Sequence, residues 1–230
     1  MKVIFIKPRK VAGTSFEIAL SKYTSKADVV TPITDNDEKM REIWGGARNY
    51  KHSFKELLTS PKKLTYTLYN HKRPVKFYNH ISAAEIKELF GDKLWGESLK
   101  ITIVRNPYDR IISQYFYETR MSKNKIDFER WLRANPHMIA VNNQQYLIKG
   151  NNVIDLYIRY ENLEEDIKNL EGKILGLKGL WDTFENINAK GNIRPKTATP
   201  KEIFSHYPQA KAVVDFFCKY EIENFGYHLN

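Results

Sequence analysis

The residues near the start of the chain that are best suited to chemistry lie between Lys7 and Ser15. This segment combines cations, a glycine and two hydroxyls: Lys7, Arg9, Lys10, Gly13, Thr14 and Ser15. Backbone N–H groups, hydroxyls and ammonium groups that converge on one point are the donors that bind phosphate or sulfate. The segment therefore indicates an anion site, provided that its flanking elements aim these donors at one place.

The flanking residues predict a strand followed by a helix. Residues 3–6 are a short β-branched and aromatic run, which is typical of a buried strand. From Thr14 onward, apolar residues recur at helical spacing: Phe16, Ala19, Leu20 and Tyr23. A helix that begins here would direct its first N–H groups and its positive end at the anion. Gly13 would let the backbone approach closely.

The alternative for this loop is a basic connection without a ligand. The segment also differs from the nucleotide-kinase loop G-x-x-x-x-G-K-[ST], because Gly13 and not lysine precedes Thr14. Taken alone, the loop therefore indicates phosphate or sulfate binding and nothing more specific.

A second candidate cluster follows the clearest strand in the sequence, residues 100–104. Arg105 ends that strand, and Asn106 is a good N-cap for the helix that follows. Ser113 lies on the same side of this helix as Asp109, so Ser113 and Arg105 can face one point near the helix N-terminus. A buried arginine needs an anionic partner. We therefore expect Arg105 to meet either a ligand anion or a carboxylate such as Asp109.

His80 lies between two predicted elements. Residues 75–79 are interpreted as a strand, and a capping box at Ser82 opens a helix that runs to about Phe90 and is closed by Gly91. Ligands of open parallel sheets bind where strands lead into helices. His80 is thus a candidate proton acceptor, and the alternative is a turn residue bonded only to the backbone.

The rest of the chain continues to alternate between helices and strands. Residues 127–149 are predicted to be helical, 153–158 to form another strand, and 186–200 to form an acid-free loop that contains Arg194 and Lys196. The last helix is predicted to start near Pro208 and to bury four apolar residues: Val213, Phe216, Phe217 and Tyr220. This alternation indicates an α/β fold with a parallel β-sheet flanked by helices on both faces.

Composition narrows the class of protein. A chain of 230 residues can bury one substantial core, so we expect a single domain over residues 1–230. The net charge of +10 favours polyanionic partners. Segment 57–84 holds five lysines and arginines and no acid, and it is either a solvated basic face or a wall of an anion-binding cleft.

The cysteine content and the lack of long apolar runs indicate the cellular compartment in which we expect the protein. Cys218 is the only cysteine, so an intrachain disulfide is impossible and a reducing compartment is favoured. We find no signal peptide and no apolar run of about 18 residues. We therefore expect a cytoplasmic protein without a transmembrane segment.

Taken together, these motifs resemble the sulfotransferase superfamily, nearest to its carbohydrate-type (family 2-like) branch. The segment from Arg9 to Ser15 resembles the family's P-K-T-A-G-T-S loop, and 104–113 resembles V-R-[ND]-P-x-x-R-x-x-S. Residues 79–82 are similar to the family's short histidine segment, and 220–227 to its D-x-x-x-F-G-Y ending. Arg9 replaces a proline and Glu221 replaces an aspartate, but neither change removes a proposed ligand.

The resemblance implies a fold like that of P-loop nucleotide kinases and a co-substrate, 3′-phosphoadenosine 5′-phosphosulfate (PAPS). By this resemblance, Lys10 and the 13–15 segment contact the 5′-phosphosulfate. Arg105 and Ser113 contact the 3′-phosphate, and His80 is the base. Further nucleotide contacts are expected from three residues: Arg9, Arg194 and Lys196. The implied reaction needs no metal, and the sequence shows no metal-ligand spacing.

The sequence also leads to an expectation about the acceptor and leaves two alternative functions. The resemblance implies a hydroxyl or amine of a carbohydrate, glycolipid or small molecule, and the basic 57–84 segment favours an anionic acceptor. A P-loop nucleotide kinase is the enzymatic rival, but it would need a lysine before Thr14 and an acidic strand end where Arg105 stands. A nucleic-acid-binding module is favoured only by charge, and we expect no nucleic acid partner.

Overall fold

The centre of the molecule is a parallel three-stranded sheet. The computed structural model describes residues 2–122, 126–187 and 193–229. Strands β1 (Lys2–Ile6), β2 (Ser98–Val104) and β5 (Leu156–Arg159) lie in the order β1-β2-β5. Val3 pairs with Leu99 in the register of β1 and β2. The strands predicted over 3–6 and 100–104 are confirmed, and the one predicted over 153–158 is shorter and later.

Helices cover both faces of this sheet, as the alternating pattern predicts. One face packs Ile101 and Ile103 against α1 (Gly13–Ser21), α9 (Leu163–Lys173) and α10 (Leu180–Glu185). The other face packs Ile6 and Val104 against α5 (Ala83–Gly96), α8 (Val141–Tyr146) and α13 (Lys219–Phe225). Because neighbouring residues of a strand point to opposite faces, an apolar run with few interruptions is needed to bury both sides.

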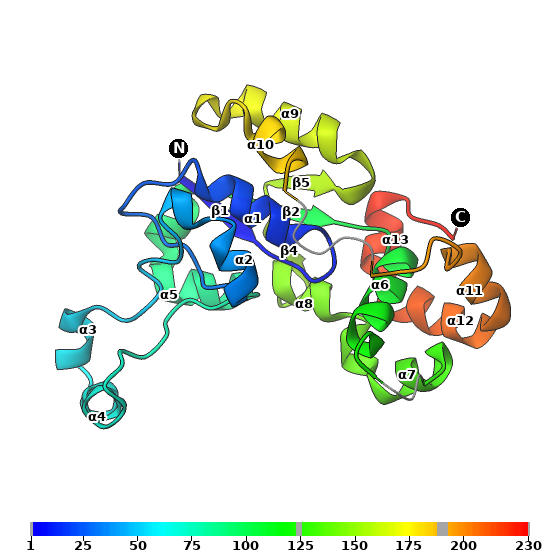
Figure 1. Cartoon of the computed structure of the whole chain (residues 1–230), viewed down its shortest axis with the longest axis horizontal. Coiled ribbons are helices and arrows are strands. Elements are labelled where there is room, and N and C mark those ends of the chain that lie inside the picture. Colours follow the sequence, from blue (N-terminus) through cyan, green and yellow to red (C-terminus); the bar gives the residue numbers. More distant parts are fainter. Residues whose placement is uncertain (1, 123–125, 188–192, 230) are drawn as a thin grey trace.

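A second group of helices packs beyond one end of the sheet (Figure 1). It consists of α6 (Pro107–Thr119), α7 (Phe128–Ala134), α11 (Pro200–His206) and α12 (Pro208–Phe217). Its core contains Tyr108, Ile112 and Trp131. Arg110 is fully buried there, and its guanidinium donates to the carbonyl oxygens of Met138, at 3.0 Å, and of Ile139. The helix that follows β2 therefore connects the sheet to this helical group.

The remaining elements are short. They are α2 (Asp35–Lys39), α3 (Phe54–Leu58), α4 (Pro61–Asn70), the antiparallel pair β3 (Leu147–Ile148) and β4 (Asn151–Asn152), and 3-10 turns at Glu42–Trp44, Pro136–Met138, Tyr160–Asn162 and Leu175–Leu177. The helical region predicted over 127–149 is thus divided into α7, a 3-10 turn and α8, with β3 after them. Among the described residues, none of the helices combines the length and apolarity required to cross a bilayer.

The predicted strand over 75–79 is wrong. Val75 makes one isolated antiparallel bridge with Lys51, and the N–H groups of Lys76 and Phe77 both donate to the Tyr50 carbonyl oxygen. Phe77 is buried in the core beside the sheet, so one packed aromatic residue accounts for the apolar signal. The segment lies against an irregular stretch near Tyr50, which supplies no ladder of hydrogen-bond partners.

One helix prediction is confirmed and another needs correction. The Ser82 capping box opens α5, and its helical geometry stops at Gly91, with φ 76° and ψ 162°, before a second helical stretch continues to Gly96. In α12, the side chains of Val213, Phe216 and Phe217 are exposed, and Tyr220 in α13 is half-buried. The buried residues recur at four-residue spacing and are all small or medium-sized: Ala210, Val214 and Cys218. Residue size therefore pointed to the wrong face of the helix.

Candidate functional site

A cavity of about 720 Å³ opens at the carboxyl ends of β1 and β2. It brings together the candidate residues from four distant parts of the sequence: Arg9, Lys10, Gly13, Thr14, Ser15, His80, Arg105, Ser113 and Arg194. Lys196 is exposed and does not line it. Part of the loop predicted over 186–200 lies outside the described residues.

The loop from Lys7 to Gly13 is held in an unusual backbone shape. Lys10 and Ala12 have φ angles of 59° and 61°, in the left-handed region. Asn142 on α8 clamps Arg9, because the Arg9 N–H donates to its Oδ1 at 2.8 Å and its Nδ2 donates to the Arg9 carbonyl at 3.0 Å. A Cβ at position 13 would lie 2.9 Å from Lys7 Cγ. Glycine is therefore required where α1 begins beside the cavity.

The two lysines of this loop have different surroundings. Lys7 is buried and its Nζ lies 2.6 Å from Glu17 Oε2. Arg41, also buried, donates to the other Glu17 oxygen at 3.3 Å. Lys10 Nζ instead lies 4.1 Å from the centre of the Tyr117 ring on α6. Glu17 thus compensates the Lys7 charge, whereas the Lys10 charge is placed against an aromatic face at the cavity.

Arg105 is fixed by three contacts. It forms an ion pair with Asp109, at 2.5 Å from Nη2 to Oδ2, and its Nη1 donates to the Lys10 carbonyl at 2.7 Å. Its guanidinium also lies 3.9 Å from the centre of the Tyr160 ring. Arg194 pairs with the second Asp109 oxygen. The local carboxylate partner considered for Arg105 is therefore present, while Arg105 and Arg194 both still line the cavity.

His80 has a backbone φ of 63° and contacts the loop of Lys7 directly. Its Nδ1 lies 2.9 Å from the Lys7 carbonyl oxygen. Because a carbonyl oxygen only accepts, Nδ1 carries the proton and Nε2 carries the lone pair in the neutral ring. Burial lowers the pKa of His80 to about 4, so the ring is neutral at pH 7. Its own carbonyl accepts from Gln145 Nε2 at 3.0 Å.

The position of His80 was predicted, but the reason for it was wrong. No strand leads directly into this residue, and a left-handed turn bonded to the 7–15 loop places it beside the cavity. The hydrogen bond between His80 and the loop that follows β1 therefore holds the histidine at this edge of the sheet.

The electrostatics of the cavity favour an anion. Arg9, Lys10, Arg105 and Arg194 line it, and Asp109 is the carboxylate that pairs with two of them. Arg9 Nε is buried and has no hydrogen-bond partner among the described residues. A buried charged donor without a partner is costly. An anionic ligand in the cavity would offset that cost.

Comparison with known proteins identifies the family. A model described as "Sulfotransferase family" matches residues 2–227, nearly the whole chain. The chain belongs to the sulfotransferase family. It is also 34% identical over 113 residues to an uncharacterised protein of Archaeoglobus fulgidus, a match that covers 47% of this chain and 93% of that protein.

Several contacts in this sulfotransferase were not predicted from the sequence. Tyr117 and Tyr160 line the cavity, and Asn142 clamps its loop. The Asn- and Gln-rich run at 142–145 was a visible signal, because neighbouring amides in a helix often bond to backbone groups. Nothing local distinguished Lys7 from Lys10, since their difference depends on Glu17 and Tyr117.

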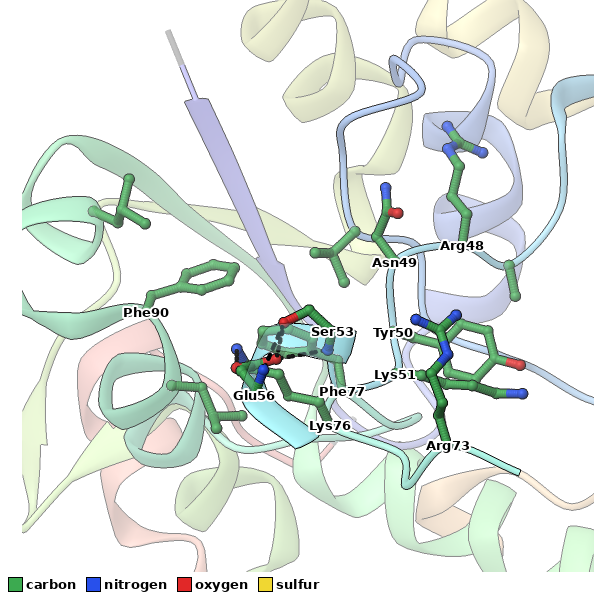
Figure 2. Close-up of a pocket in the computed structure, with 14 residues that line it drawn as sticks. Arg48, Asn49, Tyr50, Lys51, Ser53, Glu56, Arg73, Lys76, Phe77 and Phe90 are labelled. Atoms are coloured by element: carbon green, nitrogen blue, oxygen red, sulfur yellow. Dashed lines mark hydrogen bonds and ion pairs between the residues drawn. The ribbon is translucent and has the colours of Figure 1, made fainter. Parts of the chain in front are cut away.

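A second cavity of the sulfotransferase, about 620 Å³, lies between segments 47–53 and 73–77 and α5 (Figure 2). Its cations already have protein partners: Arg48 donates to three carbonyl oxygens, and Lys76 lies 2.6 Å from Glu56. We place the candidate site at the first cavity, because that cavity brings together the 9–15 loop, Arg105 and Ser113. Within the described residues, no group of three or more His, Cys, Asp or Glu is arranged to hold a metal ion.

Proposed function

We propose that this sulfotransferase transfers the sulfuryl group of PAPS to a hydroxyl or amine of a carbohydrate or glycolipid. The observation that carries the proposal is one cavity lined by both phosphate-binding candidates, the Arg9–Ser15 loop and the pair Arg105 and Ser113. The buried Arg9 Nε and the cationic lining support an anionic nucleotide. We also propose that the fold is of the P-loop nucleotide kinase type.

The proposed residue roles follow from charge and proton balance. The acceptor oxygen or nitrogen forms a bond to sulfur while the bond between sulfur and the 5′-phosphate oxygen breaks. Lys10 and the first N–H groups of α1 stabilise the negative charge that builds on the leaving phosphate. His80 Nε2 takes the acceptor's proton. Arg105 and Ser113 hold the 3′-phosphate in ground and transition states alike, so they govern nucleotide affinity more than turnover.

Nucleotide choice tests the donor. We expect 3′-phosphoadenosine 5′-phosphate, the product nucleotide, to bind without magnesium about 10- to 150-fold more tightly than ADP, the worth of one charge-assisted contact. Calorimetry on Arg105→Ala should show most of this preference lost. Arg159→Ala is the matched control, because Arg159 ends β5 but is exposed and does not line the cavity. Equal affinities for the two nucleotides, or magnesium-dependent ATP binding, would instead favour the kinase alternative.

The acceptor is proposed to be anionic. The cationic cavity lining and the net charge of +10 would attract a uronic acid or an already sulfated sugar. Transfer of radiolabelled sulfuryl to neutral and acidic oligosaccharides of matched length would measure this preference. Faster transfer to the neutral series would contradict an anionic acceptor while leaving the donor assignment intact.

A further inference from the structure

The α3–α4 hairpin, residues 53–73, extends away from the body of the protein at the lower left of Figure 1. Leu57 is the only buried residue of α3, and no residue of α4 is buried. The side chains of Thr65, Thr67 and Asn70 donate to carbonyl oxygens of α4 itself. The outer helix is thus stabilised mainly from within, and most of its surface faces solvent.

Large apolar side chains are exposed on this hairpin. Phe54 is 71% exposed and Leu58 is 77% exposed, and their four-residue spacing places them on one side of α3. On α4, Leu68 is 68% exposed and Tyr69 is 84% exposed. Scattered exposed leucines are ordinary, but four large apolar residues exposed on one short hairpin are a local concentration of apolar surface.

Positive charge surrounds these apolar residues. Segment 53–76 contains six lysines and arginines and a single acid, Glu56, a local excess of five positive charges. Lys76 Nζ lies 2.6 Å from Glu56 at the base of the hairpin, so the carboxylate is paired away from the outer lysines. The remaining cations lie along or next to the two helices: Lys55, Lys62, Lys63, Lys72 and Arg73.

The ends of the hairpin are joined to each other, and next to them the N–H groups of Lys76 and Phe77 donate to the Tyr50 carbonyl oxygen. Figure 2 shows Ser53, Glu56 and Lys76 joined at the rim of the second cavity, where the Glu56 carboxylate accepts from the Ser53 N–H at 2.7 Å. Arg73 lies 5.0 Å from the centre of the Phe54 ring. A fixed base with an exposed apolar and cationic tip is suited to insertion into a surface.

We propose that the α3–α4 hairpin docks this protein on an anionic lipid surface. Phe54, Leu58, Leu68 and Tyr69 would enter the interface, and the lysines would contact the acidic headgroups. Aliphatic and aromatic side chains with surrounding lysines are the composition of interfacial helices. An acidic soluble polymer would pair with the lysines but would leave Leu58 and Leu68 in water. The inference goes beyond the proposed function and does not depend on it.

Co-sedimentation with vesicles tests the docking. We expect the full chain to bind vesicles of phosphatidylcholine with phosphatidylserine, to bind phosphatidylcholine alone weakly, and to dissociate as salt is raised. Leu58→Ser combined with Leu68→Ser should lower the partition coefficient about tenfold or more, because two apolar side chains no longer enter the interface. Lys62→Gln, Lys63→Gln and Lys72→Gln together should cause a similar loss.

Two matched controls make the test specific. Leu175→Ser with Phe216→Ser removes exposed apolar residues outside the hairpin, and Lys93→Gln, Lys173→Gln and Lys201→Gln removes exposed lysines elsewhere. Both controls should bind like the unmodified chain. Equal losses in the controls, or no binding to the acidic vesicles, would overturn the proposal. A dimer that Leu58→Ser with Leu68→Ser dissociates would also overturn it, because a second copy would then cover the apolar face.

Discussion

Lys7 and Lys10 are three residues apart, yet they have different surroundings in the structure. Lys7 is buried in an ion pair with Glu17, whereas Lys10 lies at the cavity against Tyr117. Lys10→Ala should lower kcat by about 10²–10³, the usual loss of one transition-state donor, without changing Tm. Lys7→Met should mainly lower the free energy of unfolding, by roughly 3 kcal/mol, because Glu17 loses a buried partner.

Single-turnover kinetics and thermal unfolding of both variants separate these effects. A large loss of kcat in Lys7→Met with unchanged Tm would show that Lys7, and not Lys10, contacts the reacting group. The register assigned to the loop would then be wrong.

His80 carries the second prediction at this scale. His80→Asn should lower sulfuryl transfer by about 10²–10⁴ while nucleotide affinity stays unchanged, because the ring would face the acceptor and not the phosphates. His71→Asn is the matched control, since His71 is exposed at the end of α4. A near-normal rate in His80→Asn, or a larger loss in His71→Asn, would assign the base elsewhere.

The pH dependence of the reaction follows from the surroundings of His80. The base must be neutral to accept a proton, and burial lowers its pKa from 6.5 to about 4. The kcat/KM of the unmodified enzyme should therefore stay level from pH 7 down to about pH 5 and fall only as the pH approaches 4. An acidic limb near pH 6.5 would mean that the ring titrates as if it were in water.

The same lowered pKa affects stability, with a sign that can be worked out. Below pH 6.5 the unfolded chain binds a proton at position 80, while the folded chain does so only near pH 4. Acidification from pH 7 to about pH 4.5 should therefore lower the free energy of unfolding of the unmodified protein by roughly 2 kcal/mol more than that of His80→Asn. Denaturant unfolding of the two proteins at pH 7 and at pH 4.5 measures this difference.

At the scale of elements, strong local signals predicted structure well. The runs at 3–6 and 100–104, which are rich in β-branched residues, formed central strands, and the capping box at Ser82 opened α5. The strand predicted over 75–79 is wrong because the apolar signal there comes from a single buried residue, Phe77. The buried face of α12 was missed for a similar reason. Ala210, Val214 and Cys218 fit closely against other helices, which the sizes of side chains in sequence do not reveal.

The meeting of the candidate residues at one cavity was predicted better than the elements that position them. Motif residues such as Lys10 and Arg105 carry their chemistry in their types and spacing, so their convergence could be expected. Contacts such as Asn142 with Arg9, or Tyr160 with Arg105, join segments far apart in the sequence. No local pattern encodes those pairings, because packing of the whole fold decides them.

Arg110 provides a test of how α6 is fixed. It is fully buried, and it donates to the Met138 and Ile139 carbonyl oxygens. Arg110→Met keeps much of the volume but leaves both carbonyls without this donor. We expect the free energy of unfolding to fall by about 3 kcal/mol or more, and Tm by roughly 6–12 °C. Arg130→Met, which changes an exposed arginine of α7, should unfold like the unmodified chain, and equal Tm values for the two variants would contradict this role.

At the scale of the whole molecule, the candidate site lies where the sheet and the helical group meet. The 7–15 loop follows β1, Ser113 and Tyr117 come from α6, and Arg194 comes from the segment that leads to α11. A nucleotide in this cavity would therefore contact both parts of the fold. At about 100 times its Kd, it should add about 2.7 kcal/mol to the free energy of unfolding and raise Tm by several degrees.

Arg194 should connect the bound nucleotide to segment 193–199. In the structure, Arg194 pairs with Asp109, which also holds Arg105. A 3′-phosphate beside Arg105 would place a second anion near Arg194 and order its segment. Saturating 3′-phosphoadenosine 5′-phosphate should thus slow amide exchange in both 9–15 and 193–199. Arg194→Ala should lose the protection of 193–199 alone, whereas Lys196→Ala, at an exposed neighbour, should keep it. Unchanged protection in Arg194→Ala, or its loss in Lys196→Ala, would show that Arg194 does not hold the nucleotide.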